Sequence, residues 1–271
     1  MSPHRKRRSR RTALTLIELL SALTIMTFIM GALAVLARGV QVAAKYSDGQ
    51  GTAVQHGRVI IERITSKIRG AYANALFPGV AVVDTKIGSD DYPNTLVVWS
   101  PSGAAANLSG APLLGELVIY APNPSAPNEF WEVTDRGNTT ALNTFSASTI
   151  QTDISGLISK TTSKKTVLTD LMRAVTPTGV ANTSNSQQAA VRFLLTLTPS
   201  ASQMKYYSNG TVTWANLPWP QDLYGASTGI RNVWVRMELQ LNAGPLGGIS
   251  GNAEDLLPCL GSATLNYALT P

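Results

Sequence analysis

The amino-acid sequence predicts an α+β fold in which one long N-terminal helix is followed by an antiparallel β-sheet domain. Three observations lead to this prediction: an apolar run near the N-terminus, an amphipathic segment behind it, and short β-favouring runs separated by turn residues from Pro78 onward. The 271 residues have room for one such appendage and a single globular domain. We therefore expect four segments: a basic N-terminal segment at 1–13, an apolar helix at 14–37, an amphipathic stem helix at 38–76 and a β-rich globular domain at 77–271.

The net charge of +6 is confined to the first 13 residues of the chain. This segment contains no acidic residue, so the remaining 16 of the 22 basic residues face 16 acidic residues and the body of the protein is neutral. Its basic residues are Arg5, Lys6, Arg7, Arg8, Arg10 and Arg11. A nucleic-acid partner is not expected, because the part that would form a binding domain has no excess of positive charge.

Residues 14–37 form the apolar run, and Glu18 is the one charged residue in it. A helix of 24 residues is about 36 Å long, enough to cross a bilayer core of about 30 Å. The basic residues before the run predict a cytoplasmic N-terminus and an exported C-terminal part. A carboxylate inside such a span is costly unless it meets a positive partner, which makes Glu18 the first candidate functional residue.

The segment Ala13-Leu14-Thr15-Leu16-Ile17-Glu18-Leu19-Leu20 resembles the precursors of the type IV pilin superfamily. Those precursors carry a short basic leader, then Gly or sometimes Ala, then a run such as FTLIELL. The resemblance implies that a prepilin peptidase cleaves between Ala13 and Leu14 and N-methylates Leu14. It also implies that Glu18 forms an assembly salt bridge with the N-terminal amine of a neighbouring subunit. Ala13 stands where Gly is usual and Leu14 where Phe is usual.

Residues 57–74, which end in Arg-rich sequence before a β-rich domain, resemble the minor pseudopilins of type II secretion, particularly the J kind, and large minor pilins. The resemblance implies a structural subunit of a secretion pseudopilus or pilus-like filament in the bacterial inner membrane, with no enzymatic activity and no cofactor. Its partners would be prepilin peptidase, other pilin or pseudopilin subunits and, before assembly, membrane lipid. The large domain favours a minor or tip-proximal subunit.

Two other interpretations of the N-terminus stay open at this point. Residues 9–14 also resemble a twin-arginine export signal, and residues 32–34 or 35–37 could serve an ordinary signal peptidase. Either would make the protein an exported binding domain with no filament role. A plain signal anchor is the third possibility.

The segment after residue 37 has the pattern of an amphipathic stem helix that packs on its own domain. Its apolar side comprises Val54, Gly57, Ile60, Ile61, Ile64, Ile68 and Tyr72. Its polar side comprises Arg58, Glu62, Arg63, Lys67 and Arg69. Residues 47–52 contain two glycines, which predict a kink or a melted turn. His56 is expected on the solvated face, because no second imidazole is available for a metal site.

Short runs rich in β-favouring residues follow the stem. They predict strands at 81–86, 95–100, 116–121, 130–134, 191–198 and 232–241. The last run alternates apolar and polar residues, as in a strand with one wet face. The pair Asn209-Gly210 predicts a hairpin turn between strands at 204–207 and 211–214.

The sequence lacks the residue patterns of common enzyme and metal sites. It has no Gly-rich phosphate loop and no nucleophile elbow, and a lone Cys259 can form neither an internal disulfide nor a thiolate cluster. Asp84, Asp90 and Asp91 could suggest a calcium site, but acidic residues close together in a loop are more often solvated, and we predict that these are. The segment 218–220, with Trp214 nearby, is predicted to pack rather than to bind a partner. We expect no metal and no catalytic residue.

Overall fold

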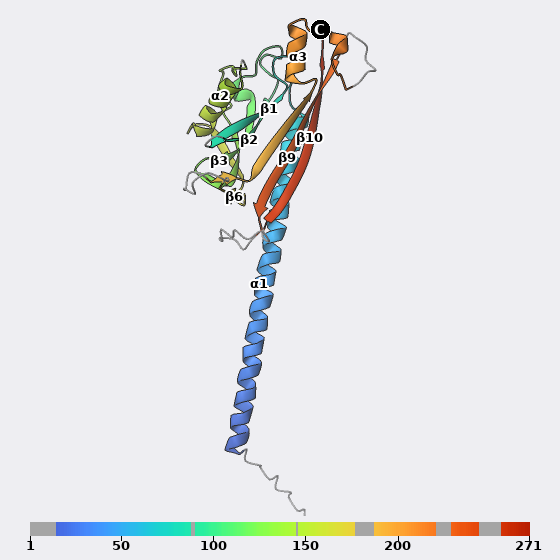
Figure 1. The fold of residues 1–271 in the computed structure, drawn as a ribbon. Helices are drawn as coiled ribbons and strands as arrows, with labels where there is room; N and C mark the ends of the chain where they lie inside the picture. Colours follow the sequence, from blue (N-terminus) through green and yellow to red (C-terminus); the bar gives the residue numbers. More distant parts are fainter. Residues whose placement is uncertain (1–14, 88–89, 145, 177–186, 221–228, 244–255) are drawn as a thin grey trace, which may run out of the picture. The chain divides into compact units, whose positions relative to one another are not determined.

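The predicted α+β fold is confirmed by a computed structural model, which describes residues 15–87, 90–144, 146–176, 187–220, 229–243 and 256–271. One long N-terminal helix is followed by a domain of antiparallel sheets (Figure 1). The chain divides into two compact units, one ending at Asp48 and one beginning at Gly49.

Helix α1 runs from Leu16 to Arg69 and contributes to both units. It continues without interruption through residues 47–52, so the expected melted turn is not present. The helix ends at Arg69 rather than near residue 76. Two basic residues in its last turn, Lys67 and Arg69, suit the negative end of the helix dipole.

The part of α1 from Gly49 onward is the amphipathic stem. Its buried residues recur every three or four positions, as one face of a helix requires: Ala53, Gly57, Ile60, Ile64 and Ile68. The prediction was wrong by one position at the start of this face, because Val54 is 50% exposed and Ala53 is buried in its place. The buried stripe belongs to the core of the domain.

Two antiparallel sheets form most of the domain. The five-stranded sheet has the order β1 (Val80–Ile87), β2 (Asp90–Trp99), β3 (Leu117–Asn123), β4 (Ala126–Thr134), β5 (Lys164–Thr169). The three-stranded sheet has the order β10 (Leu256–Leu269), β9 (Gly229–Asn242), β8 (Val191–Thr198). A short pair joins β6 (Ala174–Val175) to β7 (Gln188–Ala189).

The stem packs against both large sheets in one hydrophobic core. Ile60 and Ile64 share this core with Tyr120 and Phe130 of the five-stranded sheet and with residues of the three-stranded sheet such as Val235. Strands β9 and β10 run beside the C-terminal part of α1 (Figure 1). The stem is therefore a structural element of the domain, as its amphipathic pattern predicted.

Helix α2 (Ala147–Ser159) covers the opposite face of the five-stranded sheet. Ile154 and Leu157 pack there on residues such as Trp99 and Ile119. The Ser146 side chain accepts a hydrogen bond from Thr149 N and caps the helix start.

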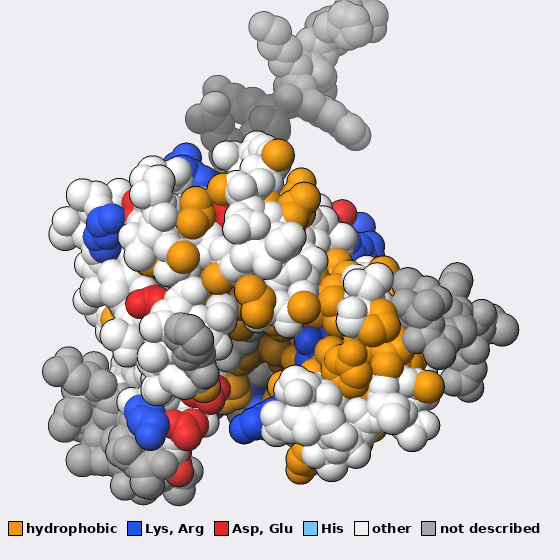
Figure 2. All heavy atoms as spheres, turned by 90° about the horizontal axis from the view of Figure 1, so that it is seen from above, with side chains coloured by type: hydrophobic (Ala, Val, Ile, Leu, Met, Phe, Trp, Pro, Cys, Tyr) orange, Lys and Arg blue, Asp and Glu red, His pale blue; other side chains and the backbone are white. Residues whose placement is uncertain are grey.

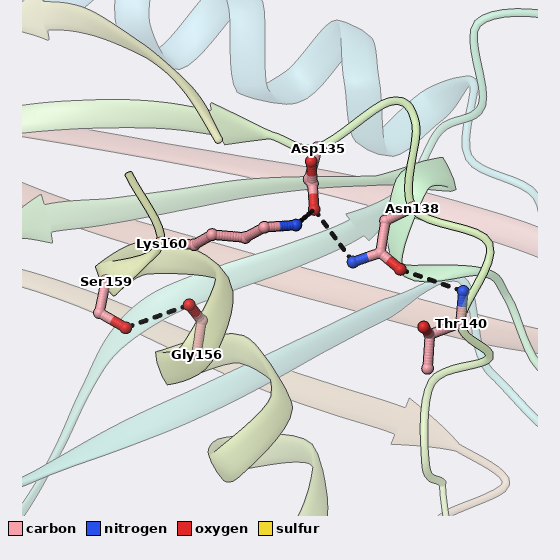
Figure 3. Close-up of polar contacts among 6 residues, drawn as sticks. All are labelled: Asp135, Asn138, Thr140, Gly156, Ser159 and Lys160. Carbon is pink, nitrogen blue, oxygen red and sulfur yellow. Dashed lines mark hydrogen bonds and ion pairs between the residues drawn. The ribbon is translucent and has the colours of Figure 1, made fainter. Parts of the chain in front are cut away.

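An ion pair ties the C-terminal end of α2 to the loop after β4. Lys160 Nζ lies 2.7 Å from Asp135 Oδ2, which also accepts a hydrogen bond from Asn138 Nδ2 at 3.0 Å (Figure 3). The hydrogen bond from Lys160, supported by that from Asn138, lowers the pKa of Asp135. Asn138 Oδ1 accepts in turn from Thr140 N, so the loop is held by a short chain of polar contacts.

Each of the six predicted β-favouring runs overlaps a strand, although Ser100 and Glu116 fall just outside β2 and β3, and in β9 the predicted alternation is confirmed. Val233, Val235, Met237, Leu239 and Leu241 are buried. Strands β5 and β10 and helix α2 were not predicted. β10 contains Pro258 and Gly261, which usually argue against a strand, and β5 opens with two lysines.

The predicted Asn-Gly hairpin is wrong, because residues Ala201–Ser208 form helix α3 instead. Ser200 caps its start by accepting from Gln203 N, and Asn209 is its C-cap. Gly210 follows with φ +72°, the left-handed conformation that commonly ends a helix. The same dipeptide that closes a hairpin thus serves here as a helix stop, after which Trp214–Asn216 forms a 3-10 turn.

The tryptophans near residue 218 pack together, as predicted. The rings of Trp214 and Trp219 lie 4.5 Å apart between centroids, and Tyr207 of α3 contacts Trp214 edge-on at 5.1 Å. The indole N–H of Trp219 donates to Trp214 O at 2.9 Å. Together with Leu217 and Leu269 these rings form a small satellite core.

Candidate assembly site at the start of the N-terminal helix

Glu18 lies in the first turn of α1 and is hydrogen-bonded to the residue that precedes the helix. Its Oε2 accepts from Thr15 N at 2.9 Å and from Thr15 Oγ1 at 3.0 Å. In return, Glu18 N donates to Thr15 Oγ1 at 3.4 Å. This reciprocal arrangement is a capping box, which satisfies backbone donors that a helix start leaves free.

The capping role of Glu18 was missed at the level of sequence, although Thr15-Leu16-Ile17-Glu18 carries the T-x-x-E pattern that signals it. Both bonds from Thr15 go to one carboxylate oxygen. No described residue donates to Oε1, so the cap leaves acceptor capacity for a second, positively charged partner.

The rest of the apolar span offers no competing charge among its described residues. Its hydroxyl groups bond within the helix: Ser21 Oγ donates to Ile17 O at 2.7 Å and Thr27 Oγ1 to Thr24 O at 2.8 Å. The side chains from Leu16 to Arg38 are all exposed in the single chain. Among the described residues, α1 is the one helix long and apolar enough to cross a membrane. An exposed apolar helix of this kind requires lipid or neighbouring helices around it.

Two of the predicted site residues, Ala13 and Leu14, lie outside the described residues, as do the basic residues that precede them. The structure therefore gives the position of Glu18 alone among the predicted processing and assembly residues. The cleavage and N-methylation of the chain remain predictions.

On one flank, polar contacts fasten the stem to the five-stranded sheet. Arg63 forms a two-pronged ion pair with Glu132 of β4, at 2.7 and 2.8 Å. Burial is the largest single influence on Glu132 and opposes its ionisation, but the hydrogen bond and the positive charge of Arg63, together with smaller contributions such as that of Lys67, outweigh burial and lower the pKa of Glu132. His56 Nδ1 lies 3.0 Å from Thr169 Oγ1 of β5. The expectation that His56 is merely solvated was therefore wrong, because the β5 edge reaches the stem.

On the other flank, the stem meets β10 through glycines. A Cβ atom at Gly57 would overlap Cys259 Sγ, and one at Gly261 would lie 2.6 Å from Ile61 Cγ2. The helix and strand approach so closely only because both positions lack a side chain. Burial raises the pKa of the Cys259 thiol, so this cysteine behaves as a packing residue.

The acidic residues weighed for calcium do not gather into a metal site. Asp84 lies on β1, while Asp90 and Asp91 lie on β2 rather than in a loop. Burial and the nearby Asp91 raise the pKa of Asp84. In the described part of the chain, no group of three or more His, Cys, Asp or Glu side chains is arranged to hold a metal ion.

The surface of the domain also bears on partners. On the face shown in Figure 2, Lys and Arg side chains are scattered among neutral ones and form no continuous basic patch.

Comparisons with known proteins found no relative: no family model, no curated protein and no solved structure matches the chain. The interpretation of Glu18 therefore depends on its geometry and on the sequence around it.

Proposed function

We propose that this protein is a structural subunit of a type II secretion pseudopilus or type IV pilus-like filament, most consistent with a minor or tip-proximal position. The observation that carries the proposal is Glu18: a carboxylate in the first turn of an exposed apolar helix, held by Thr15 and with an oxygen still available. In lipid or among packed helices, a charge of this kind is costly unless a partner brings the opposite charge.

The architecture supports this proposal in a second way. An apolar helix that continues as a stem buried in a β domain suits a subunit that waits in a membrane and then packs its helix among others. In this proposal the N-terminus is cytoplasmic, the β domain is extracytoplasmic, and the chain crosses the bacterial inner membrane once. Prepilin peptidase removes residues 1–13 and methylates the new terminus at Leu14.

Mass analysis of the chain co-expressed with a prepilin peptidase tests the processing step. The expected product starts at N-methylated Leu14. A product starting near Val35 or Arg38 would instead establish an exported binding domain and remove the filament proposal.

Variants of Glu18 test assembly separately from membrane insertion. Glu18→Leu removes a carboxylate that lipid disfavours, so membrane level and leader cleavage should persist. In a filament it would leave the ammonium of a neighbouring Leu14 without its partner, and assembly should fail. Glu18→Gln should give an intermediate result, because an amide accepts a hydrogen bond but carries no charge.

The readout is crosslinking to the partner subunits encoded beside this gene, at matched membrane abundance. Ser21→Leu is the matched control, since it places the same residue in the same span while leaving Glu18 in place. Equal partner recovery for the wild type, Glu18→Gln and Glu18→Leu would refute the assembly role of Glu18.

A further inference from the structure

No described strand pairs with one of the two edges of β10, which we call its free edge, and the pairing of the sheet shows which backbone groups lie along it. β10 pairs with β9 from Leu256 to Leu269 without a register shift, so successive residues point their N–H and C=O groups alternately toward β9 and toward the free edge. Gln240 of β9 lies opposite Pro258. Once the direction of the backbone groups of Gln240 and Pro258 is known, it follows whether the even-numbered or the odd-numbered residues of β10 point their N–H and C=O groups to the free edge.

Both backbone groups of Gln240 point away from β10. Its N–H donates to Ala190 O at 2.9 Å, and its C=O accepts from Arg173 N at 2.9 Å. Pro258 therefore directs its backbone toward the free edge, which suits a residue without an N–H. The even-numbered residues that follow do the same: Leu260, Ser262, Thr264, Asn266 and Ala268. Their backbone groups form no hydrogen bond with any described residue along that edge.

This edge lacks the protection that the edges of the five-stranded sheet carry. β5 has two lysines, Lys164 and Lys165, which discourage pairing. On β1, Asp84 O already accepts a hydrogen bond from Gln151 Nε2 of α2 at 2.7 Å. β10, in contrast, contains no charged residue in 14 residues. A long uncharged edge with unpaired backbone groups is a template for a further strand.

A groove of 480 Å³ lies between the stem and this edge. Cys259 and Leu260 of β10 line one side of it, and the stem lines the other with Gly57, Arg58, Ile61, Glu62 and Thr65. Leu260 is 66% exposed. A strand edge facing a helix across a groove is the geometry in which extended peptides add to a sheet.

We propose that the free edge of β10 binds an extended segment of another polypeptide, which adds a fourth strand to the three-stranded sheet. Unpaired N–H and C=O groups spaced along a strand are complementary to another extended backbone. Side chains of the segment that face the stem meet Ile61 and Thr65, so small apolar or hydroxyl-bearing residues fit there. The site is independent of Glu18 and of the filament proposal.

The groove favours a single segment over the sheet of a second copy. A volume of 480 Å³ accommodates the side chains of a few residues. A second copy pairing through its own β10 would bring its own stem to this side of the sheet, and a helix about 10 Å wide does not fit.

A defined peptide tests this proposal on the full chain in detergent micelles. The probe is an acetylated and amidated peptide with the sequence of residues 231–242, which already pairs with the other edge of β10. Hydrogen exchange resolved to single amides is the readout. Binding should slow exchange at Leu260, Ser262, Thr264 and Asn266, whose N–H groups lie on the free edge.

Two lysine variants separate edge pairing from nonspecific binding. Ser262→Lys should weaken peptide binding by about tenfold or more, because it places a charge on the edge strand. Val167→Lys makes the same charge change on exposed β5 and should leave binding unchanged. Unchanged exchange at odd-numbered β10 amides would show that Ser262→Lys still folds.

Three results would overturn the proposal. The first is equal peptide binding by the wild type and Ser262→Lys. The second is protection by the peptide elsewhere than on β10. The third is protection of the even-numbered β10 amides without peptide, whether it is constant or rises with protein concentration, since the edge would then be covered by this chain or by a second copy.

Discussion

The two parts of α1 are built by the same backbone but stabilised by different surroundings. From Leu16 to Arg38 every side chain is exposed, and among the described residues the Glu18 side chain bonds only to Thr15. From Gly49 onward, one face is buried between two sheets. The apolar side chains of the first part need lipid or neighbouring helices around them. Those of the second part pack against the sheets of the same chain.

This difference indicates which substitutions in α1 should destabilise the β domain. An apolar residue in the span makes no contribution to the core of the β domain, however hydrophobic it is. An apolar residue in the stem stripe contributes through packing that cannot relax freely. On the full chain in detergent we expect four effects of decreasing size.

The largest effect is expected at the centre of the buried stripe. Ile64→Ala should destabilise the domain by about 2–5 kcal/mol, because it removes buried methyl groups and leaves a cavity. Ile25→Ala, the same change at an exposed position of the span, should leave unfolding of the domain unchanged. Denaturant unfolding followed by tryptophan fluorescence measures both. Equal losses would show that the two parts of α1 unfold as one unit.

The next effect concerns the close approach of the stem to β10. Gly57→Ala should destabilise the domain by about 1–3 kcal/mol, because the new Cβ overlaps Cys259 Sγ. Gly51→Ala is the matched control in the same helix, where no atom lies within 4 Å, and should stabilise it by up to about 1 kcal/mol. Adding Cys259→Ala should recover part of the loss at Gly57, and no recovery would contradict this contact.

A smaller effect is expected from the ion pair between Arg63 and Glu132. The pKa of Glu132 is lowered in the folded protein, so the pair stabilises the fold above the ordinary glutamate value of 4.5 and loses this contribution as pH falls below it. Because Arg63 is 45% exposed, the contribution should be about 1 kcal/mol or less. Glu132→Gln should remove this part of the pH dependence. If the free energy of unfolding depended on pH in the same way for Glu132→Gln and the wild type between pH 3 and pH 7, the contribution of this ion pair would be refuted.

The smallest effect is expected at Asp135, in the loop after β4. The pKa of this carboxyl is also lowered, chiefly by Lys160, so its contribution is likewise lost as pH falls below the ordinary value of 3.8. Since the Lys160 side chain is 44% exposed, Asp135→Asn should cost about 0.5 kcal/mol. High salt should reduce this difference, and a loss as large as that from Ile64→Ala would contradict the assignment.

Periodicity predicted the elements whose side chains alternate cleanly between core and solvent. The stem stripe and β9 are of this kind: in β9 the expected residues are buried, and in the stem Gly57, Ile60, Ile64 and Ile68 are buried while Val54 is not. The edge strand β10 was not predicted, because Pro258 and Gly261 weaken its local signal and pairing with β9 outweighs them. The hairpin prediction at Asn209-Gly210 was wrong for a related reason. A glycine with positive φ suits both a hairpin turn and a helix end, and here it ends a helix because the capped helix α3 precedes it.

The candidate sites divide in the same way. Glu18 was identified from the sequence, because a charge in an apolar run is a local signal. The free edge of β10 could not be identified from the sequence. Which β10 residues point their backbone groups to that edge depends on the hydrogen bonds that Gln240 forms with residues elsewhere in the chain. The link between His56 and Thr169 joins residues 113 apart, beyond any local pattern.

The unbroken course of α1 also has a mechanical consequence. Because the helix contains no interruption before it enters the core, a pull on its N-terminal part is carried along a continuous series of backbone hydrogen bonds to the stem. There the load would act along the rows of Ile60, Ile64 and Ile68 and shear them against both sheets at once. Packed rows that must slide together resist such a force better than contacts that can be peeled apart one at a time.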